Sequence, residues 1–189
     1  MDDDDFMPTG RKLDVDVYHG MAEIGIFGED DRVELIDGAI IDMAPIGQSH
    51  AAAVNGLTRA LVMACGSKAI ASVQNPIRLD RLNEPQPDFA VLRPRADFYA
   101  AGDRPGPADV LLLVEVADSS LRYDLTVKLP LYARAGIPEL WIVDLKRRAL
   151  DAFRRPTSGR YAEVATYRPG DRLALAAADI AVRLDLALA

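Results

Sequence analysis

The chain has 189 residues, with 22 Lys and Arg against 29 Asp and Glu and a formal net charge of -7. Half of its residues are hydrophobic, which excludes disorder for most of its length. The single cysteine, Cys65, excludes an intramolecular disulfide and a cysteine-based zinc site. No apolar run reaches the roughly 18–20 residues of a membrane span, and the acidic N-terminus is the opposite of a signal peptide. We therefore expect a soluble, cytoplasmic protein, and its acidity argues against broad nonspecific nucleic-acid binding.

The N-terminal region predicts a flexible leader, a short helix and a hairpin. Residues 1–16, with four consecutive Asp, are expected to be a flexible acidic leader, and 17–189 a single domain. A helix is expected around residues 18–26. Asp37-Gly38 lies between two apolar runs and predicts a two-residue hairpin turn. The resulting register pairs Ile36 with Ala39, Leu35 with Ile40, and Glu34 with Ile41, so Glu34 is the odd member of an apolar face.

The remaining elements alternate between helix and strand and predict a mixed α/β domain. A helix capped by Ser49 should run to about Ala64 and end at Gly66, and another should span residues 121–135, where Pro130 removes one helical hydrogen bond. The apolar run at 110–116 is typical of a central strand buried on both faces. Strands are expected at residues 69–73, 77–79, 88–92, 110–116, 140–144, 149–153, 161–166 and 182–186.

Several charged residues occupy positions where the periodicity of the predicted strands and helix leads us to expect apolar residues. Asp88 opens a strand and Glu115 lies within the most apolar strand, although burying a lone carboxylate costs several kcal/mol. Asp124 and Lys128 lie four residues apart on the inward stripe of their helix. One interpretation is a structural ion pair on a half-exposed helix; the other is that Lys128 reaches over the sheet edge toward Glu115.

Two carboxylates on adjacent strand ends with a nearby lysine suit metal-assisted hydrolysis of a phosphodiester. Mg²⁺ prefers carboxylate oxygens, backbone carbonyls and water, and it lowers the pKa of its bound water. A lysine can orient the attacking water or stabilise developing charge. The chain has no glycine-rich phosphate loop and no G-x-S-x-G motif, and its two histidines, His19 and His50, give no metal-ligand spacing.

Three segments together resemble one family in their order and spacing. They are GIFGEDDRVELIDGAIIDMAPIGQSH, PQPDFAVL and LLLVEVADSSLRYDLTVKLPLYARAGIPELWIVD. From about residue 18 to about residue 167 the chain resembles the Uma-two family of restriction-endonuclease-like proteins, a branch of the PD-(D/E)XK nuclease superfamily. The resemblance implies a restriction-endonuclease-like α/β core: a mixed β-sheet flanked by helices, with an N-terminal β-hairpin and extra C-terminal strands.

The resemblance also implies a catalytic set. Asp88 matches the first acid of the motif and Glu115 the second, and these two would hold Mg²⁺, or Mn²⁺, with the backbone carbonyl of Val116. The superfamily pattern places a lysine where this chain has Ala117, and Lys128 matches the position to which the family's lysine has moved. Further candidates are a fourth catalytic residue, Glu34, and three supporting residues, His50, Asp124 and Gln86. His50 could contact a phosphate or hold Glu34, or simply start its helix.

The leading hypothesis is therefore a metal-dependent endonuclease acting on nucleic acid, and specifically on DNA. One alternative is a non-catalytic binding or assembly module with the same fold. Another is a metal hydrolase of a small phosphorylated substrate, which the net acidity favours because duplex binders usually carry a basic patch. The superfamily often works as dimers, so a homodimer is a further expectation.

Overall fold

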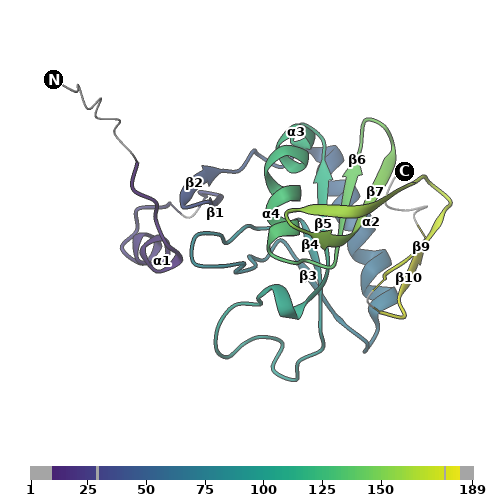
Figure 1. Cartoon of the computed structure of the whole chain (residues 1–189), viewed down its shortest axis with the longest axis horizontal. Helices are drawn as coiled ribbons and strands as arrows, with labels where there is room; N and C mark the ends of the chain where they lie inside the picture. Colours follow the sequence, from purple (N-terminus) through teal and green to yellow (C-terminus); the bar gives the residue numbers. More distant parts are fainter. Residues whose placement is uncertain (1–9, 29, 177, 184–189) are drawn as a thin grey trace.

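A six-stranded mixed sheet forms the centre of the molecule (Figure 1). The computed structural model describes residues 10–28, 30–176 and 178–183. Only β5 and β6 run parallel, since a helical crossover connects them, and every other neighbouring pair is antiparallel. In sheet order the strands are β3 (Ile70–Val73), β4 (Phe89–Leu92), β5 (Val110–Ala117), β6 (Glu139–Asp144), β7 (Ala149–Thr157) and β8 (Arg160–Tyr167).

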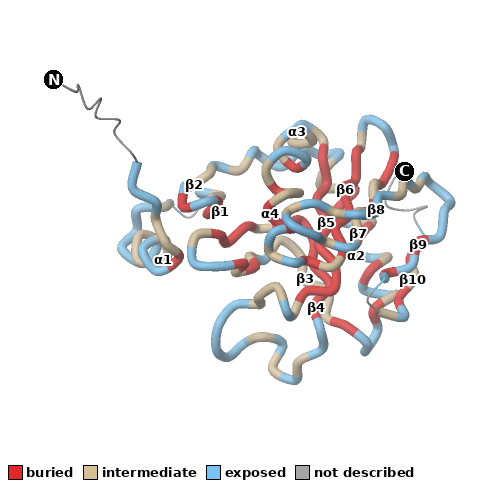
Figure 2. The backbone as a smooth tube through the Cα atoms, in the orientation of Figure 1, coloured by how far each residue is buried: buried red, intermediate tan, exposed pale blue. Residues whose placement is uncertain are grey.

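The two central strands are buried on both faces, as their apolar runs predict (Figure 2). Because side chains alternate along β5, Val114 and Val116 pack into one core and Leu113 and Ala117 into the other. Glu115 has the parity of Leu113 and Ala117. The alternation of β5 therefore directs this carboxylate into the second core, on the opposite face from Val114 and Val116.

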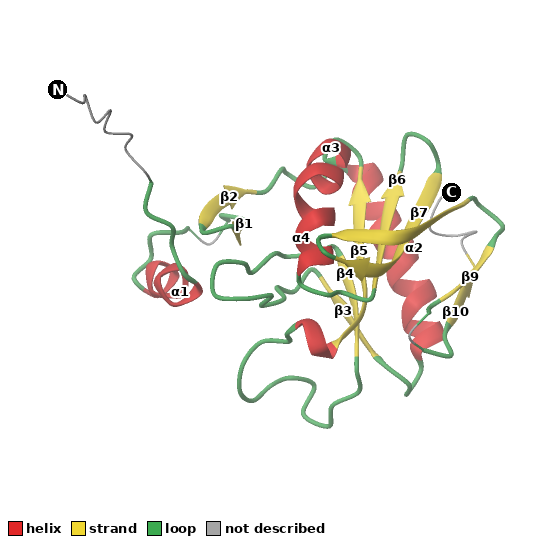
Figure 3. Ribbon diagram, in the orientation of Figure 1, coloured by secondary structure: helices red, strands yellow, loops and turns green. Residues whose placement is uncertain are grey.

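Helices cover the two faces of the sheet (Figure 3). α2 (Gln48–Cys65) packs on the first core, together with β9 (Arg172–Ala174) and β10 (Ala181–Arg183). A helical run covers the second core and comprises α3 (Leu121–Tyr123), a π-helical turn η2 (Asp124–Lys128) and α4 (Leu129–Arg134). A short 3₁₀ helix, η1 (Pro107–Asp109), precedes β5. In the described part of the chain, every helix is too short or too polar to cross a membrane.

The N-terminal part lies beside the sheet and consists of α1 (Val15–Glu23) and the hairpin β1 (Val33–Ile36) and β2 (Ala39–Asp42) (Figure 1). The predicted hairpin register is confirmed pair by pair. Asp37 and Gly38 both have positive φ, as a two-residue turn requires. Main-chain hydrogen bonds join the hairpin to the segment before β4, for example from the Gly38 amide to the Leu82 carbonyl.

Some predicted boundaries are corrected by the structure. α1 begins at Val15 because Asp14 accepts a hydrogen bond from the Val17 amide, so residues 14–16 of the expected leader are the cap and first turn of a helix. Residues 1–9 of that leader lie outside the described residues. Ser49 is not the cap of α2; the extended Gly47 is, and its hydrogen-only side chain makes no capping bond.

Two errors concern short segments. Residues 77–79 do not form a strand, because the Ile77 and Leu79 amides bond to carbonyls of the same loop, those of Pro85 and Asn83. β9 was not predicted, and three residues are too few for a periodic pattern. Its partner β10 starts at Ala181, and residues 184–186 of the strand expected there lie outside the described residues.

Candidate active site

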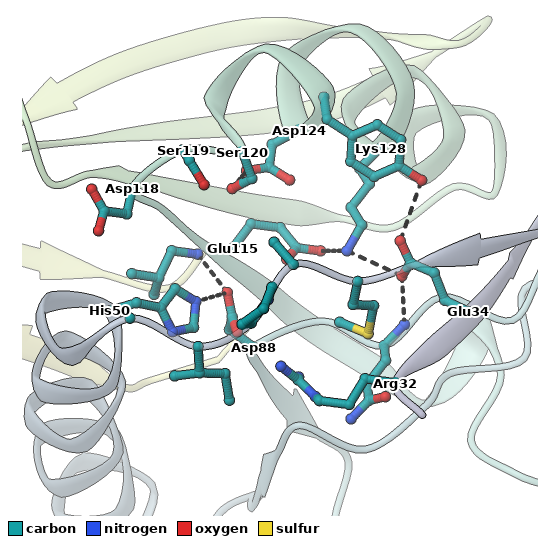
Figure 4. Close-up of a pocket in the computed structure, with 18 of the residues that line it drawn as sticks. Arg32, Glu34, His50, Asp88, Glu115, Asp118, Ser119, Ser120, Asp124 and Lys128 are labelled. Carbon is teal, nitrogen blue, oxygen red and sulfur yellow. Dashed lines mark hydrogen bonds and ion pairs between the residues drawn. The ribbon is translucent and has the colours of Figure 1, made fainter. Parts of the chain in front are cut away.

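Two adjacent strands bring Asp88 and Glu115 to the floor of one pocket (Figure 4). Asp88 directly precedes β4, and the antiparallel register places Phe89 opposite Val114, the neighbour of Glu115. The two acidic residues are 8% and 3% exposed. The sequence prediction that these carboxylates stand close together on neighbouring strands is therefore correct as geometry.

Asp88 is held through one carboxylate oxygen. Its Oδ2 accepts hydrogen bonds from the Val116 amide at 2.8 Å and from His50 Nε2 at 3.0 Å, while Oδ1 lies 3.4 Å from Gln74 Nε2. Burial would raise the pKa of Asp88, but the hydrogen bonds from His50 and Val116 outweigh it and lower the pKa. Asp88 therefore keeps its negative charge although it is buried.

His50 lies in the first turn of α2 and points at Asp88. Its hydrogen bond with Asp88 raises the imidazole pKa more than burial lowers it. Its Nδ1 is buried without a hydrogen-bond partner within the described ranges. The expectation that His50 holds Glu34 is corrected, because the histidine contacts Asp88 instead.

Lys128 lies between two buried carboxylates. Its Nζ is 3.2 Å from Glu34 Oε2 and 3.2 Å from Glu115 Oε1, and the residue is only 4% exposed. Burial would lower the pKa of the ammonium group, but the charges of Glu115, Glu34 and Asp124 together raise it. Lys128 therefore stays protonated, and the interpretation in which it reaches over the sheet toward Glu115 is the one observed.

The helix that carries Lys128 is wound more loosely at this point. The amide of Leu129 bonds to the carbonyl of Asp124, five residues back, which defines a π-turn. Pro130 follows and has no N–H with which to continue a regular α-helical ladder. The structure thus has a single helical run from Leu121 to Arg134 where the helix over 121–135 was predicted. Its irregular turn, from Asp124 to Lys128, faces the pocket.

Glu34 uses both of its oxygens within the protein. Oε2 accepts from Lys128 and from the Gln86 amide at 3.1 Å, and Oε1 accepts from the Tyr123 hydroxyl at 3.2 Å. Glu34 lies on β1, and its side chain points from the hairpin toward Lys128 on the helical run (Figure 4). Gln86 itself is anchored by its side-chain amide, which donates to the Gln74 carbonyl.

Glu115 receives the Tyr132 hydroxyl at 2.6 Å on Oε1, the same oxygen that Lys128 approaches. Its complete burial raises the pKa of this carboxyl to about 8, against the opposing effect of Lys128. Asp124 is also buried and accepts a hydrogen bond from Ser120 Oγ at 2.7 Å, and burial raises its pKa. The floor of the pocket therefore holds several carboxylates that a cation would stabilise.

The pocket has a volume of about 400 Å³. All seven residues proposed from the sequence line it, namely Glu34, His50, Gln86, Asp88, Glu115, Asp124 and Lys128. Residues 15–187 match the model of a family named Uma2 and described as "Putative restriction endonuclease". The chain belongs to the Uma2 family.

One solved structure that is similar to this Uma2 protein is a crystal structure at 1.96 Å resolution, described as "a putative nuclease belonging to DUF820" from Anabaena variabilis ATCC 29413. The two chains are 16% identical and superpose with a TM-score of 0.67, over 88% of this chain and 96% of the other. At that identity the likeness shows the fold. The comparison with curated proteins finds no match.

Several residues that line the Uma2 pocket, or that bond to its acids from outside it, were not predicted as site residues. Tyr132 is fully buried in the core, and its hydroxyl also donates a hydrogen bond to Glu115. Its position four residues after Lys128 was the available signal, because such residues share a helix face. Tyr123 lies on the same helical run as Lys128 but five residues before it, which is not the spacing of one helix face. Gln74 and Arg32 gave no signal, because the positions of their segments are determined only by the fold.

The arginines of the loop after β4 do not line this pocket, and each has a partner in the protein. Arg93 donates to the Ala108 carbonyl, Arg95 pairs with Asp97, and Arg104 pairs with Glu84. These contacts are those of ordinary loop residues rather than of residues that bind phosphate.

Proposed function

We propose that this Uma2 protein is an endonuclease that hydrolyses phosphodiester bonds in DNA with the help of Mg²⁺ or Mn²⁺. The observation that carries the proposal is the meeting of Asp88, Glu115 and Lys128 in one pocket, from two strands and a helix. Family membership supports nuclease chemistry in general.

The residues present fit a hard divalent cation. Asp88 Oδ1 accepts only the long 3.4 Å hydrogen bond from Gln74, and both described contacts of Glu115 fall on Oε1, so each acid keeps an oxygen with acceptor capacity for a metal. In the described ranges no cluster of three or more His, Cys, Asp or Glu could hold a metal. Mg²⁺ commonly binds through only one or two carboxylates and keeps several waters, so two acids are a sufficient protein contribution.

When bound, such a cation would supply a water of lowered pKa and neutralise phosphate charge. The chain's own residues do the rest. Lys128, which stays protonated, cannot act as a general base, so its ammonium group would orient the attacking water and stabilise the charge that develops on the phosphate. Glu34 would be a positioning residue, because both of its oxygens hold Lys128, Tyr123 or the Gln86 amide rather than a metal.

Cleavage assays with matched variants test the proposal. We expect cleavage of DNA in Mg²⁺ or Mn²⁺, none with chelator, and a loss of about 100-fold or more for Asp88→Asn, Glu115→Gln and Lys128→Met. Asp30→Asn removes an exposed carboxylate outside the pocket and should leave the rate unchanged. Absence of metal-dependent cleavage of any nucleic acid would contradict the proposal.

Calorimetric titration with Mn²⁺ separates the enzyme from its alternatives. An enzyme of this kind binds Mn²⁺ in a manner that Asp88→Asn abolishes, whereas a binding module that lost its activity shows no such binding. Parallel assays on DNA and on small phosphate esters separate a nuclease from a small-molecule hydrolase, since a nuclease should strongly prefer DNA.

A further inference from the structure

Arg32 brings an unengaged positive charge to a pocket with an excess of carboxylates. The six acids that line it are Glu34, Asp42, Asp88, Glu115, Asp118 and Asp124. Lys128 is already held by two of them. Arg32, by contrast, makes no salt bridge and no side-chain hydrogen bond in the parts of the chain that the structure describes, and its side chain points into the pocket (Figure 4). A guanidinium in this position is suited to bind phosphate oxygens.

An apolar wall stands beside Arg32. The Met43 amide donates to the Arg32 carbonyl at 2.8 Å, so the chain that leaves β2 is fixed next to the arginine. Ile46 is 44% exposed although it is a large aliphatic residue. Ile, Met and Pro are the residue types that DNA-binding proteins insert against unstacked bases. Here the wall consists of Ile41, Met43, Ala44, Pro45 and Ile46.

The dimensions of the pocket restrict what can reach its floor. Its volume of about 400 Å³ lies in the range of small-ligand sites, and a base-paired duplex is far wider than such a pocket. Asp88, Glu115 and Lys128 are almost completely buried at its floor. A scissile phosphate must therefore enter the pocket. An unpaired nucleotide can bring its base onto the apolar wall together with its phosphate, whereas a base-paired nucleotide keeps its base in the stack and offers the pocket only its backbone.

We propose that Arg32 and this apolar wall form a subsite for one unpaired nucleotide of a DNA strand. Arg32 binds the phosphate next to the scissile one, and the base packs on the wall, chiefly on Ile46. This inference rests on the proposed nuclease function and specifies its substrate. The preferred substrate is single-stranded or locally unpaired DNA, and continuous duplex is a poor one.

The test uses one labelled oligonucleotide sequence in three forms: single strand, full duplex, and duplex with an internal unpaired loop. In Mg²⁺ or Mn²⁺ the single strand and the loop should be cleaved at least tenfold faster than the continuous duplex. Ile46→Ser should raise KM for the single strand about fivefold or more, as expected for a lost base contact, with kcat nearly unchanged. Ile24→Ser, which alters an exposed isoleucine just after α1 and outside the pocket, is the matched control.

Binding measured by fluorescence anisotropy in Ca²⁺ tests the subsite independently of cleavage. Arg32→Met should weaken single-strand binding and reduce the slope of log K against log salt concentration by about one. Arg32→Lys should retain part of the affinity. Equal cleavage of all three forms, or equal binding by wild type, Ile46→Ser and Arg32→Met, would overturn the inference and leave the nuclease proposal standing. Binding that depends on Ile46 and Arg32 without any cleavage would support the subsite and refute the nuclease proposal.

Discussion

The position of Lys128 makes a quantitative prediction about stability. The ammonium group is the cation between two buried carboxylates, Glu34 and Glu115, each 3.2 Å away. Lys128→Met keeps most of the side-chain volume, so it leaves little cavity and removes mainly the charge. Both acids would then be buried without their cation.

Removing one partner from a buried ion pair typically costs about 3–5 kcal/mol, because the remaining charge is uncompensated. We expect the lower end, about 3 kcal/mol, because burial raises the pKa of Glu115 to about 8, so this carboxyl can take up a proton near neutral pH. A domain of this kind is stable by only about 5–15 kcal/mol. The variant should therefore be folded but clearly weakened.

Urea unfolding followed by the fluorescence of Trp141, the single and fully buried tryptophan, measures this loss. Lys146→Met, at an exposed lysine, should change stability by less than about 0.5 kcal/mol. The double variant Glu34→Gln with Lys128→Met should regain about 1 kcal/mol relative to Lys128→Met alone, since contacting residues are coupled. A Lys128→Met protein as stable as the wild type would refute the arrangement of charges described above.

Three further outcomes follow from the fold. Cys65 is buried, and burial raises the pKa of its thiol, so a thiol reagent should modify it only after unfolding; rapid reaction of the native protein would contradict this packing. Glu139 is fully buried and accepts from Trp141, Arg154 and the Ala176 amide, so Glu139→Ala should lose about 3–5 kcal/mol in urea unfolding, and a loss below 1 kcal/mol would refute that role. Gly38 has φ +75°, and an added Cβ would lie 2.6 Å from the Lys12 Cβ. Gly38→Ala should therefore lower the free energy of unfolding by at least about 1 kcal/mol, which would be measured as a lower Tm. Gly20→Ala, which has open space in α1, should not lower Tm.

Local chemistry made much of the fold predictable. Asp37-Gly38 specifies the hairpin and its register because few dipeptides accept two consecutive positive φ angles. The run at 110–116 is typical of a strand buried on both faces, which the structure confirms. The proximity of Asp88 and Glu115 was predictable because the residues around them indicated adjacent strands. The approach of Lys128 to this site was predictable because it lies on the inward face of its helix.

The contacts that complete the site were not predictable in this way. The hydrogen bonds of Glu34 with Tyr123 and the Gln86 amide join segments that are far apart in the sequence. The π-turn that carries Lys128 depends on Pro130 and on how the helix packs, which periodicity alone does not report. In the sequence, Arg32 is an ordinary residue next to a strand, and only the fold places it in the pocket that contains Asp88 and Glu115.

The most direct test of the central claim is the rate of cleavage of single-stranded DNA in Mg²⁺ by wild type and by Asp88→Asn, with Asp30→Asn as the surface control. The account predicts cleavage by the wild type and the control that stops on chelation and resumes when Mg²⁺ is restored, and a rate at least about 100-fold lower for Asp88→Asn. Equal rates for Asp88→Asn and wild type, or cleavage that persists in chelator, would contradict it.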